Sequence, residues 1–187
     1  MRKLPRTYAF IDSQNLNLGV RSSGWRIDYQ KFRLYLRNKY GVSKAFMFIG
    51  MVENNQELYT RLQSAGFILI FKPTVRYFVD GKETYKGNVD AELVLHAAAV
   101  QYDNYDKAII VSGDGDFTCL VEYLSTKGKL LHIFAPNRKY SKLLGRFSKY
   151  IVRIDRMKQS IEKQKDRDRR SVETLGLPGH DDATNVA

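Results

Sequence analysis

The chain has 187 residues, the length of one ordinary domain with extensions, which is enough to bury a hydrophobic core without covalent or metal cross-links. Its single cysteine, Cys119, excludes an intrachain disulfide, and no paired Cys and His spacing predicts a zinc finger. The 31 Lys and Arg residues against 20 Asp and Glu residues give a formal net charge of +11, which makes nucleic acid the first partner to consider.

The start of the chain and its apolar runs give no sign of export or of a membrane partner. The basic residues at 1–6 are soon followed by Asp12, Gln14 and Asn15, so a secretory signal is not predicted. No apolar run approaches the roughly 20 residues that a membrane-spanning helix needs. We therefore expect a cytoplasmic protein in a reducing compartment.

The first half of the chain alternates short apolar runs with segments of helical period. Phe32, Tyr35 and Leu36, for example, recur at helical spacing before Gly41, which is a typical helix-ending residue. On this basis, strands are predicted over residues 7–11, 45–52 and 67–71, and helices over residues 28–40 and 54–65.

A change of pattern follows in the middle of the chain. Residues 74–86 alternate in the manner of strands on either side of Asp80-Gly81, which predicts a hairpin with a tight turn. Residues 88–102 predict the clearest helix, with Asn88 as its N-cap and Asp90 in its first turn.

The second half repeats the alternation of strand and helix. Strands are predicted over residues 107–111, 129–134 and 150–154, and helices over residues 117–126 and 141–149. Repeated strand–helix units imply an α/β fold in which a mostly parallel sheet is covered on both faces.

Residues 155–187 differ from the rest of the chain in charge. They hold seven basic and seven acidic residues, so the whole excess of +11 lies in residues 1–154. Residues 158–170 are densely charged with both signs and predict a solvated helix, whereas residues 171–187 predict disorder. We expect one domain over residues 1–154, followed by a charged tail.

Four aspartates are placed where a parallel sheet gathers functional groups. Asp12, Asp114 and Asp116 follow predicted strand ends, and Asp90 lies in the first turn of a helix that begins at the same edge. Carboxylates brought together repel each other, and the usual outcome is a raised pKa or a bound divalent cation. Oxygen-only ligands suit Mg²⁺ or Mn²⁺, and open coordination positions can engage a phosphate. The pattern is that of a metal-dependent phosphodiesterase.

Each aspartate also has an ordinary structural explanation. Asp12 can cap a helix, Asp90 can interact with a helix dipole, and Asp114 and Asp116 can serve as turn and N-cap residues. Together these explanations account less well for the pattern, because a basic domain gains no evident stability from several acids at one sheet edge. We therefore favour the metal site.

Three segments resemble the motifs of a known family: Phe10-Ile11-Asp12-Ser13-Gln14-Asn15-Leu16, Lys86-Gly87-Asn88-Val89-Asp90 and Val111-Ser112-Gly113-Asp114-Gly115-Asp116-Phe117. They are similar, in the same order, to the three motifs of NYN-domain proteins of the LabA-like type, a branch of the PIN-like nucleases. The resemblance covers residues 6–154 and implies a Rossmann-like three-layer sandwich with an acidic Mg²⁺ or Mn²⁺ site that hydrolyses RNA. It also implies self-association, because PIN-like proteins often form homo-oligomers.

By the same resemblance, ligands of the metal or of its waters are expected at Asp12, Asp90, Asp114 and Asp116. Asn15 either orients a carboxylate or phosphate through its amide or makes an ordinary helix-start hydrogen bond. Ser112 either supports a carboxylate or phosphate through its hydroxyl or simply caps a turn. Lys86 either stabilises charge that develops on the phosphate or is a solvated lysine at the hairpin end.

A basic segment near the last predicted helix supplies candidates for RNA binding. Its proposed substrate-binding residues are Arg138, Lys139, Lys142 and Arg146. Tyr140 and Phe147 are interleaved with them, so the charges could track phosphates while the aromatic rings stack on bases. The alternative is a helix that buries Leu143, Leu144 and Phe147 and leaves the charges solvated.

Two other phosphate-handling families are weaker candidates. Residues 111–116 also resemble the late acidic motif of haloacid-dehalogenase phosphatases, but Gln14 stands where that family has its second aspartate. A response-regulator receiver would need an aspartate at the end of the third strand, where this chain has Phe71-Lys72-Pro73.

The predicted function is therefore a metal-dependent endoribonuclease, in which a metal-activated water attacks a phosphodiester bond of single-stranded or structured RNA. No side-chain nucleophile is required. The alternative is a PIN-like RNA-binding or assembly module that keeps the acids and cleaves little or nothing, because ligands reveal a site and not a rate.

Overall fold

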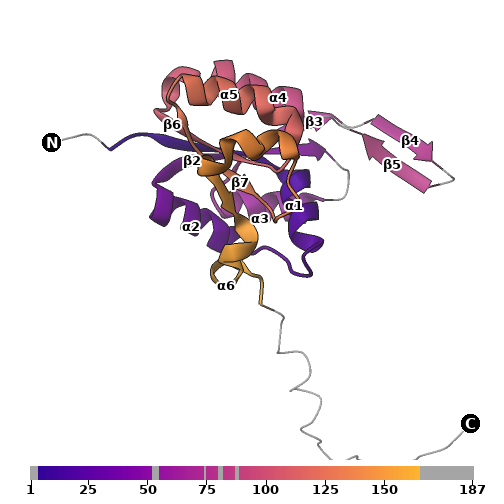
Figure 1. The fold of residues 1–187 in the computed structure, drawn as a ribbon. Coiled ribbons are helices and arrows are strands. Elements are labelled where there is room, and N and C mark those ends of the chain that lie inside the picture. Colours follow the sequence, from indigo (N-terminus) through magenta and orange to yellow (C-terminus); the bar gives the residue numbers. More distant parts are fainter. Residues whose placement is uncertain (1–3, 52–54, 74, 80–81, 87–88, 165–187) are drawn as a thin grey trace, which may run out of the picture.

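The structure is a computed structural model that describes residues 4–51, 55–73, 75–79, 82–86 and 89–164. Within these residues, the middle layer of the fold is a six-stranded sheet (Figure 1). The strand order is β3-β2-β1-β6-β7-β8, and every neighbouring pair is parallel. The strands are β1 (Thr7–Asp12), β2 (Val42–Met51), β3 (Ile68–Pro73), β6 (Lys107–Val111), β7 (Leu130–Ala135) and β8 (Ile151–Arg153).

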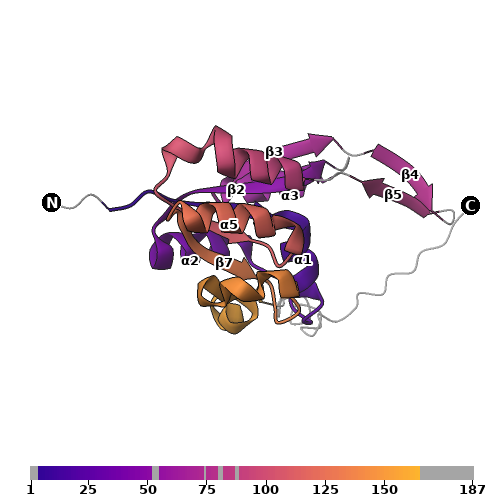
Figure 2. The same ribbon diagram turned by 45° about the horizontal axis from the view of Figure 1, so that its top comes forward.

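Helices cover both faces of this sheet (Figure 1, Figure 2). One face carries α1 (Ser13–Arg21), α2 (Tyr29–Tyr40), α3 (Gln56–Ser64) and α6 (Lys158–Ile161). The other carries α4 (Asp90–Leu95), the π-helix η1 (His96–Val100), α5 (Thr118–Thr126) and the 3₁₀ helix η4 (Lys142–Tyr150). Short 3₁₀ turns are η2 (Tyr102–Asn104), η3 (Gly115–Phe117) and η5 (Ile154–Met157). The predicted three-layer α/β fold with a parallel sheet is confirmed.

Alternation along the buried strands divides the core in two. In β1, Ala9 and Ile11 pack on the face that carries α1 and α2, whereas Tyr8 and Phe10 pack on the face that carries α4 and α5. Every residue of β1 is buried, because helices on both faces of a parallel sheet leave neither side exposed. This is why the central strands are continuous apolar runs in the sequence.

The ends of α2 follow from its sequence, whereas α1 does not stand out in the sequence as a helix. Asp28 caps α2 by accepting a hydrogen bond from the Lys31 N–H at 3.0 Å, and Gly41 closes it with a φ of 65°. In α1, Leu16 and Val20 are buried, and polar residues between and around them weaken the helical period that sequence analysis detects.

Two helical segments differ from the regular helices predicted for them. The helix predicted over residues 88–102 is α-helical in α4 and continues as the π-helix η1, where the Tyr105 hydroxyl donates a hydrogen bond to the Ala97 carbonyl at 2.6 Å. The helix predicted over residues 141–149 is the 3₁₀ helix η4. It buries Leu144 but leaves Leu143 62% exposed, so packing does not enforce a regular α-helical stripe.

β4 (Val75–Val79) and β5 (Lys82–Lys86) form an antiparallel pair beside the main sheet. This pair projects from the layered body in Figure 1 and confirms the strands of the predicted hairpin. Its predicted turn at Asp80-Gly81 and the predicted helix cap at Asn88 lie outside the described residues. Lys86 is the last residue of β5, and its side chain also lies outside the described part.

After β8 the chain returns to the face that carries α2. Ile154, Met157 and Ile161 are buried in the same core cluster as the apolar residues of α1 and α2. Ile27 and Glu162 form an antiparallel bridge, which joins the chain after α6 to the segment before α2. These residues complete the layer of helices below the sheet.

Part of the predicted charged tail is therefore described. α6 covers the first turn of the helix predicted over residues 158–170, and residues 165–187 lie outside the described part. Among helices in the described ranges, none has both the length and the apolar composition needed to span a bilayer.

Candidate active site

The direction of strand order reverses between β1 and β6, and the carboxyl ends of these strands mark the place where an open parallel sheet binds ligands. Asp12 is the last residue of β1, and Ser112 directly follows β6. Ile11 is paired with Val111, so Asp12 and Ser112 are neighbours one position further along. The buried strands thus deliver polar residues to one crevice.

Asp12 is a buried carboxylate held by two hydrogen bonds. Its Oδ1 accepts a hydrogen bond from the backbone N–H of Asn15 at 3.0 Å, which caps α1, and its Oδ2 accepts one from the Ser112 hydroxyl at 3.3 Å. Burial raises the pKa of Asp12 above its ordinary value, although the two hydrogen bonds act in the opposite direction. The carboxylate is fixed in place, and its ionised form is favoured by a nearby cation.

Hydrogen bonds also set the shape of the loop after β6. The Ser112 Oγ accepts a hydrogen bond from the Asp114 N–H at 3.2 Å, and the Asp114 Oδ1 accepts one from the Asp116 N–H at 3.0 Å. The Asn15 Oδ1 accepts a hydrogen bond from the Gly113 N–H at 2.9 Å, which ties the loop to α1. Ser112 therefore both supports a carboxylate and shapes the turn. The Asn15 amide oxygen binds the backbone of the loop at Gly113.

Both glycines of this loop pack closely against the segment after β7. A Cβ on Gly113 would lie 3.2 Å from the Tyr140 Cβ and 3.4 Å from the Pro136 Cδ. A Cβ on Gly115 would collide with the Ser141 Oγ. The glycines allow the segment after β7 to close against the loop that carries the acids.

Asp90 completes the acidic group from the start of α4. Burial raises the pKa of Asp90, and the negative charges of Asp12, Asp114 and Asp116 raise it further. The fold thus brings the side chains of the four predicted aspartates, which come from three separate segments of the sequence, within electrostatic reach of one another.

A cleft of about 630 Å³ opens over this acidic group. Asp12, Asp90 and Asp114 line it, whereas Asp116 is exposed on η3. α1 lines part of the cleft, and the segment after β7, which packs against α1, contributes Lys139 to the lining. A lining that combines acids with a lysine suits a phosphate that is bridged to the acids by a cation.

A family model described as NYN domain matches residues 6–155, a range that includes all four aspartates. The chain belongs to the NYN domain family. NYN domains are typically PIN-like nucleases.

Two relatives show how far the likeness extends. The chain is 22% identical over 165 residues to the low amplitude and bright protein LabA of Synechococcus elongatus, an alignment that covers 84% of this chain and 88% of that protein. The fold matches the crystal structure of a protein of unknown function from Vibrio parahaemolyticus with a TM-score of 0.72 and 24% identity, over 87% of this chain and 99% of that one. The second likeness shows that this layered architecture occurs in a solved structure.

The acidic group of this NYN domain fits a hard divalent cation in chemistry and charge. Carboxylate oxygens are the ligands that Mg²⁺ and Mn²⁺ prefer, and a cation would relieve the repulsion that raises the pKa of Asp90. Within the described ranges, no three Asp, Glu, His or Cys side chains lie close enough to hold one ion together. Mg²⁺ usually keeps several of its waters, so this spacing fits an ion bound directly by one or two carboxylates.

The predicted substrate-binding cations of the basic segment occupy different surroundings. Lys139 lines the cleft, whereas Arg138 and Lys142 are exposed outside its lining. Arg146 donates a hydrogen bond to the Glu122 carboxylate of α5 at 2.8 Å. The NYN cleft therefore gathers Lys139 from this segment and leaves the other three on its outer surface.

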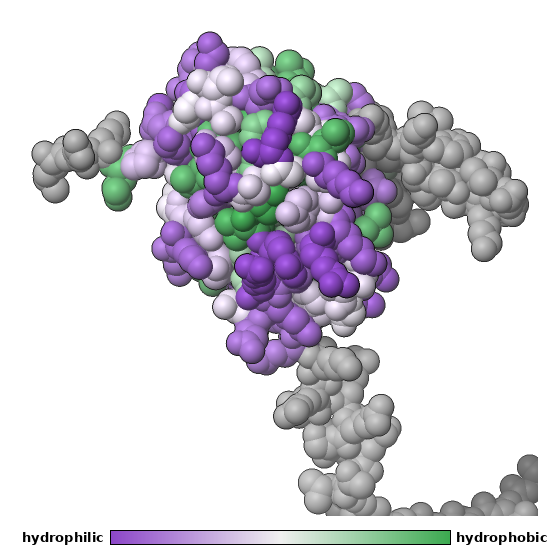
Figure 3. Space-filling view, in the orientation of Figure 1, coloured by the Kyte–Doolittle hydropathy of each residue, from purple (hydrophilic) through white to green (hydrophobic). Residues whose placement is uncertain are grey.

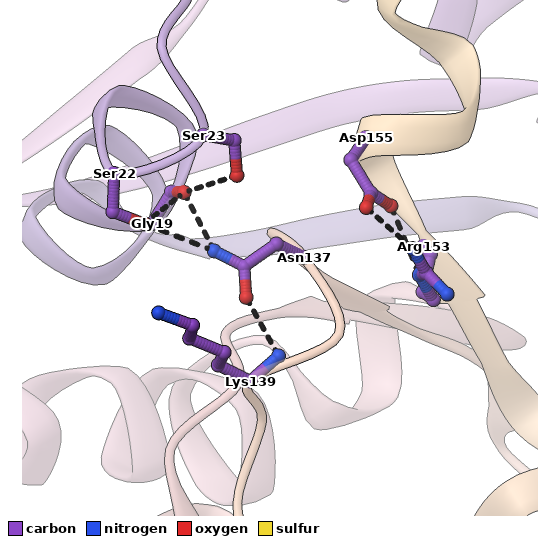
Figure 4. A network of polar contacts seen from close by, with 7 residues as sticks. All are labelled: Gly19, Ser22, Ser23, Asn137, Lys139, Arg153 and Asp155. Carbon is purple, nitrogen blue, oxygen red and sulfur yellow. Dashed lines mark hydrogen bonds and ion pairs between the residues drawn. The ribbon is translucent and has the colours of Figure 1, made fainter.

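Asn137 is a residue of the cleft wall that sequence analysis does not single out. It is 9% exposed, and its Nδ2 donates hydrogen bonds to the Gly19 carbonyl at 2.7 Å and to the Ser22 Oγ at 3.2 Å (Figure 4). Its Oδ1 accepts a hydrogen bond from the Lys139 N–H at 2.7 Å. Asn137 thus joins α1 to the segment after β7 and seats Lys139. Its position just beyond the predicted strand at 129–134 is the signal that could have identified it.

Proposed function

We propose that this NYN domain is a metal-dependent endoribonuclease that hydrolyses RNA phosphodiester bonds with Mg²⁺ or Mn²⁺ at Asp12, Asp90, Asp114 and Asp116. The observation that carries the proposal is geometric: Asp12, Asp90 and Asp114 line one cleft, and Asp116 is joined to Asp114 by a hydrogen bond from its N–H. Among the described residues, Asp12, Asp114 and Asp116 form no ion pair with a basic side chain. A divalent cation accounts for this concentration of unneutralised charge.

The protein residues would divide the work of binding and orientation. A bound Mg²⁺ or Mn²⁺ supplies a water of lowered pKa and neutralises charge on the phosphate oxygens. Asp12 and Asp114 are held by hydrogen bonds within the loop network, so their carboxylates meet the ion without reorganising. Asp90 adds charge from α4, and Asp116, which is exposed at the rim, would hold a water of the ion.

Positive and polar groups around the cleft would hold the RNA. Lys139 lines the cleft, where its charge can stabilise the developing charge on a phosphate. Arg138 and Lys142, on the outer surface, would contact neighbouring phosphates of the backbone. Asn15 and Ser112 act as positioning residues, because they hold the loop and a carboxylate.

Cleavage of RNA by the purified chain tests the proposal. A mixture of single-stranded and structured RNA, together with a circular RNA that has no ends, is incubated with Mn²⁺ or Mg²⁺. We expect the wild type to cut all classes that reach the cleft, including the circle, and Asp114→Asn to cut none. Asp103→Asn is the matched control, because Asp103 is an exposed aspartate in η2 and lies outside the lining of the cleft.

A second candidate function is a PIN-like RNA-binding or assembly module with little or no catalysis. Its supporting observation is that no three of the described acidic, His or Cys side chains can hold one ion together. This module would bind RNA with an affinity that falls as salt rises, as the nuclease would. Equal binding by wild type and Asp114→Asn, with no cleavage by either, would select the module and exclude the nuclease.

A further inference from the structure

A groove rich in positive charge lies on the face of the sheet that carries α1, α2 and α3. It consists of two adjoining cavities, of about 510 and 440 Å³, and both are lined by Arg21, Arg26 and Lys163. We call these two cavities the basic groove. Arg21 ends α1, Arg26 lies between α1 and α2, and Lys163 follows α6. The groove therefore depends on residues that are far apart in the sequence.

The groove is built by the return of the chain after α6. The Lys163 N–H donates a hydrogen bond to the Arg26 carbonyl at 2.9 Å, and the Asp28 N–H donates one to the Ile161 carbonyl at 2.8 Å. These bonds use backbone atoms, so they place Arg26 beside Lys163 while both residues remain exposed. Figure 3 shows hydrophilic side chains gathered around the position that α6 occupies in Figure 1.

The positive charge of the groove is not neutralised within the described part of the chain. There, Arg21, Arg26 and Lys163 have no ion-pair partner. Two acids also line the cavities, and the cations outnumber them: Asp28 caps α2, and Glu162 lies 3.6 Å from a lysine of α6. Three unpaired cations around one hollow attract a polyanion.

The larger cavity also has apolar walls. Ile27 and Leu62 are buried beneath it, and the half-buried Tyr29 and Leu58 border it. Apolar and aromatic surface with cations at the rim is the combination that accepts the face of a nucleobase together with its phosphates. The groove thus suits a nucleotide unit better than a simple inorganic anion.

The basic groove and the candidate active cleft are both lined by residues of α1. Leu18 of α1 lines the cleft, and Arg21, three residues further on, lines the groove. Residues three apart on a helix are neighbours on its surface. An RNA strand that leaves the cleft over the end of α1 would therefore meet the groove next.

We propose that the basic groove binds the single-stranded part of an RNA substrate that extends beyond the bond in the cleft, with its phosphates on Arg21, Arg26 and Lys163. This rests on the proposed ribonuclease function and identifies the course of the substrate outside the cleft. A free nucleotide offers the same base and phosphate chemistry, so both sources are measured.

The test is the affinity of the full chain for a fluorescent single-stranded RNA, followed by anisotropy in EDTA so that no cleavage occurs. The groove variant carries Arg21→Gln, Arg26→Gln and Lys163→Gln. We expect its Kd to rise at least about tenfold at low salt. We also expect the slope of log K against log salt to fall by about 2, because each phosphate contact on a single strand contributes about 0.7.

A matched control removes the same amount of charge from residues that lie outside the lining of the groove and of the cleft. It carries Arg37→Gln, Lys44→Gln and Lys127→Gln, whose side chains are exposed. We expect this control to bind RNA nearly as the wild type does. Equal losses in the two variants, or no loss in the groove variant, would overturn the proposal. Thermal unfolding midpoints of both variants confirm that each is folded.

Two further measurements distinguish RNA from a free nucleotide as the ligand of the groove, and distinguish the groove proposal from the ribonuclease proposal. Uridine monophosphate is titrated into wild type and groove variant, and a loss confined to this mononucleotide would overturn the RNA path. An inactive wild type whose RNA affinity still depends on the groove would refute the nuclease and support the groove. A wild type that cleaves RNA, with unchanged affinity in the groove variant, would refute the groove alone.

Discussion

The two ends of the β1–β6 strand pair carry aspartates in opposite electrostatic states. At the amino end, Asp106 accepts hydrogen bonds from the Arg6 N–H at 2.8 Å and from the Arg6 guanidinium, which lower the pKa of Asp106 to about 2. At the carboxyl end, burial raises the pKa of Asp12, and the nearby charge of Asp114 adds to this. The surroundings of Asp106 thus favour its ionised form and stabilise the fold, whereas those of Asp12 disfavour its ionised form and oppose folding. The second arrangement is understandable as a site prepared for a cation.

The largest effect that would distinguish the two ends is on catalysis. Asp12→Asn should lower the rate of metal-dependent RNA cleavage by at least roughly 100-fold, because it removes charge at the point where the proposed ion would bind. Asn can still accept the hydrogen bond that caps α1, so the fold should persist. Asp106→Asn is the matched variant at the amino end, and steady-state cleavage rates compare the two. An equal loss of activity in Asp106→Asn would show that the aspartates at the two ends do not differ in their role in cleavage.

Divalent ions should stabilise the folded protein through the carboxyl end. At a tenfold excess over the dissociation constant, Mn²⁺ should add about 1.4 kcal/mol to the free energy of unfolding, or roughly 3–6 °C in Tm. Asp114→Asn should lose most of this increase, whereas Asp106→Asn should retain it. Differential scanning fluorimetry with and without Mn²⁺ measures both, and an identical shift in the two variants would argue against a site at the carboxyl end.

Removing one of the crowded carboxylates should stabilise the protein in the absence of metal. Folding raises the pKa of Asp90, so its ionised form opposes folding above that pKa, and the opposition disappears as the pH falls and the carboxyl is protonated. Asp90→Asn should therefore raise the free energy of unfolding at pH 8 by up to about 1 kcal/mol, after allowance for solvent screening. The gain should shrink as the pH is lowered. Urea unfolding in EDTA at several pH values checks this, and a less stable variant at pH 8 contradicts it.

The smallest effect should come from the amino end. Folding lowers the pKa of Asp106 from its ordinary value to about 2, so its contribution to stability is complete above about pH 4 and is lost as the pH falls toward 2. Asp106→Asn should be slightly less stable than the wild type at pH 7, and the two should converge in acid. The side chains of Arg6 and Asp106 are 48% and 47% exposed, so solvent screens the pair and the difference should also decrease at high salt.

The sequence was sufficient to predict the sheet and the positions of the acids. Buried parallel strands are continuous apolar runs, and the residues that follow them must meet at one edge, so Asp12 and Asp114 could be placed before the fold was known. Asp90 could be placed because it starts a helix of clear period. The convergence of these residues in one cleft follows from the order of strands, which repeated strand–helix units constrain strongly.

Other features of the site depend on contacts that no local pattern encodes. The role of Asn137 depends on its meeting the carbonyl of Gly19, 118 residues earlier in the chain. The basic groove requires Lys163 to lie beside Arg26, and it forms because the chain after α6 returns to the segment before α2. Arg146 was predicted to bind substrate, but its pairing with Glu122 depends on how η4 packs against α5. Tertiary packing decides each of these.

The pairing of β1 with β6 also has a consequence for the order in which the protein forms. The residues that close its two ends, Arg6 with Asp106 and Asp12 with Ser112, are each 100 positions apart. β1 thus stays open on this side until β6, about a hundred residues later in the chain, has been synthesised, and such long-range pairing is slow. The attractive and the repulsive ends belong to the same strand pair, so the Arg6–Asp106 ion pair at one end offsets part of the repulsion among the acids at the other.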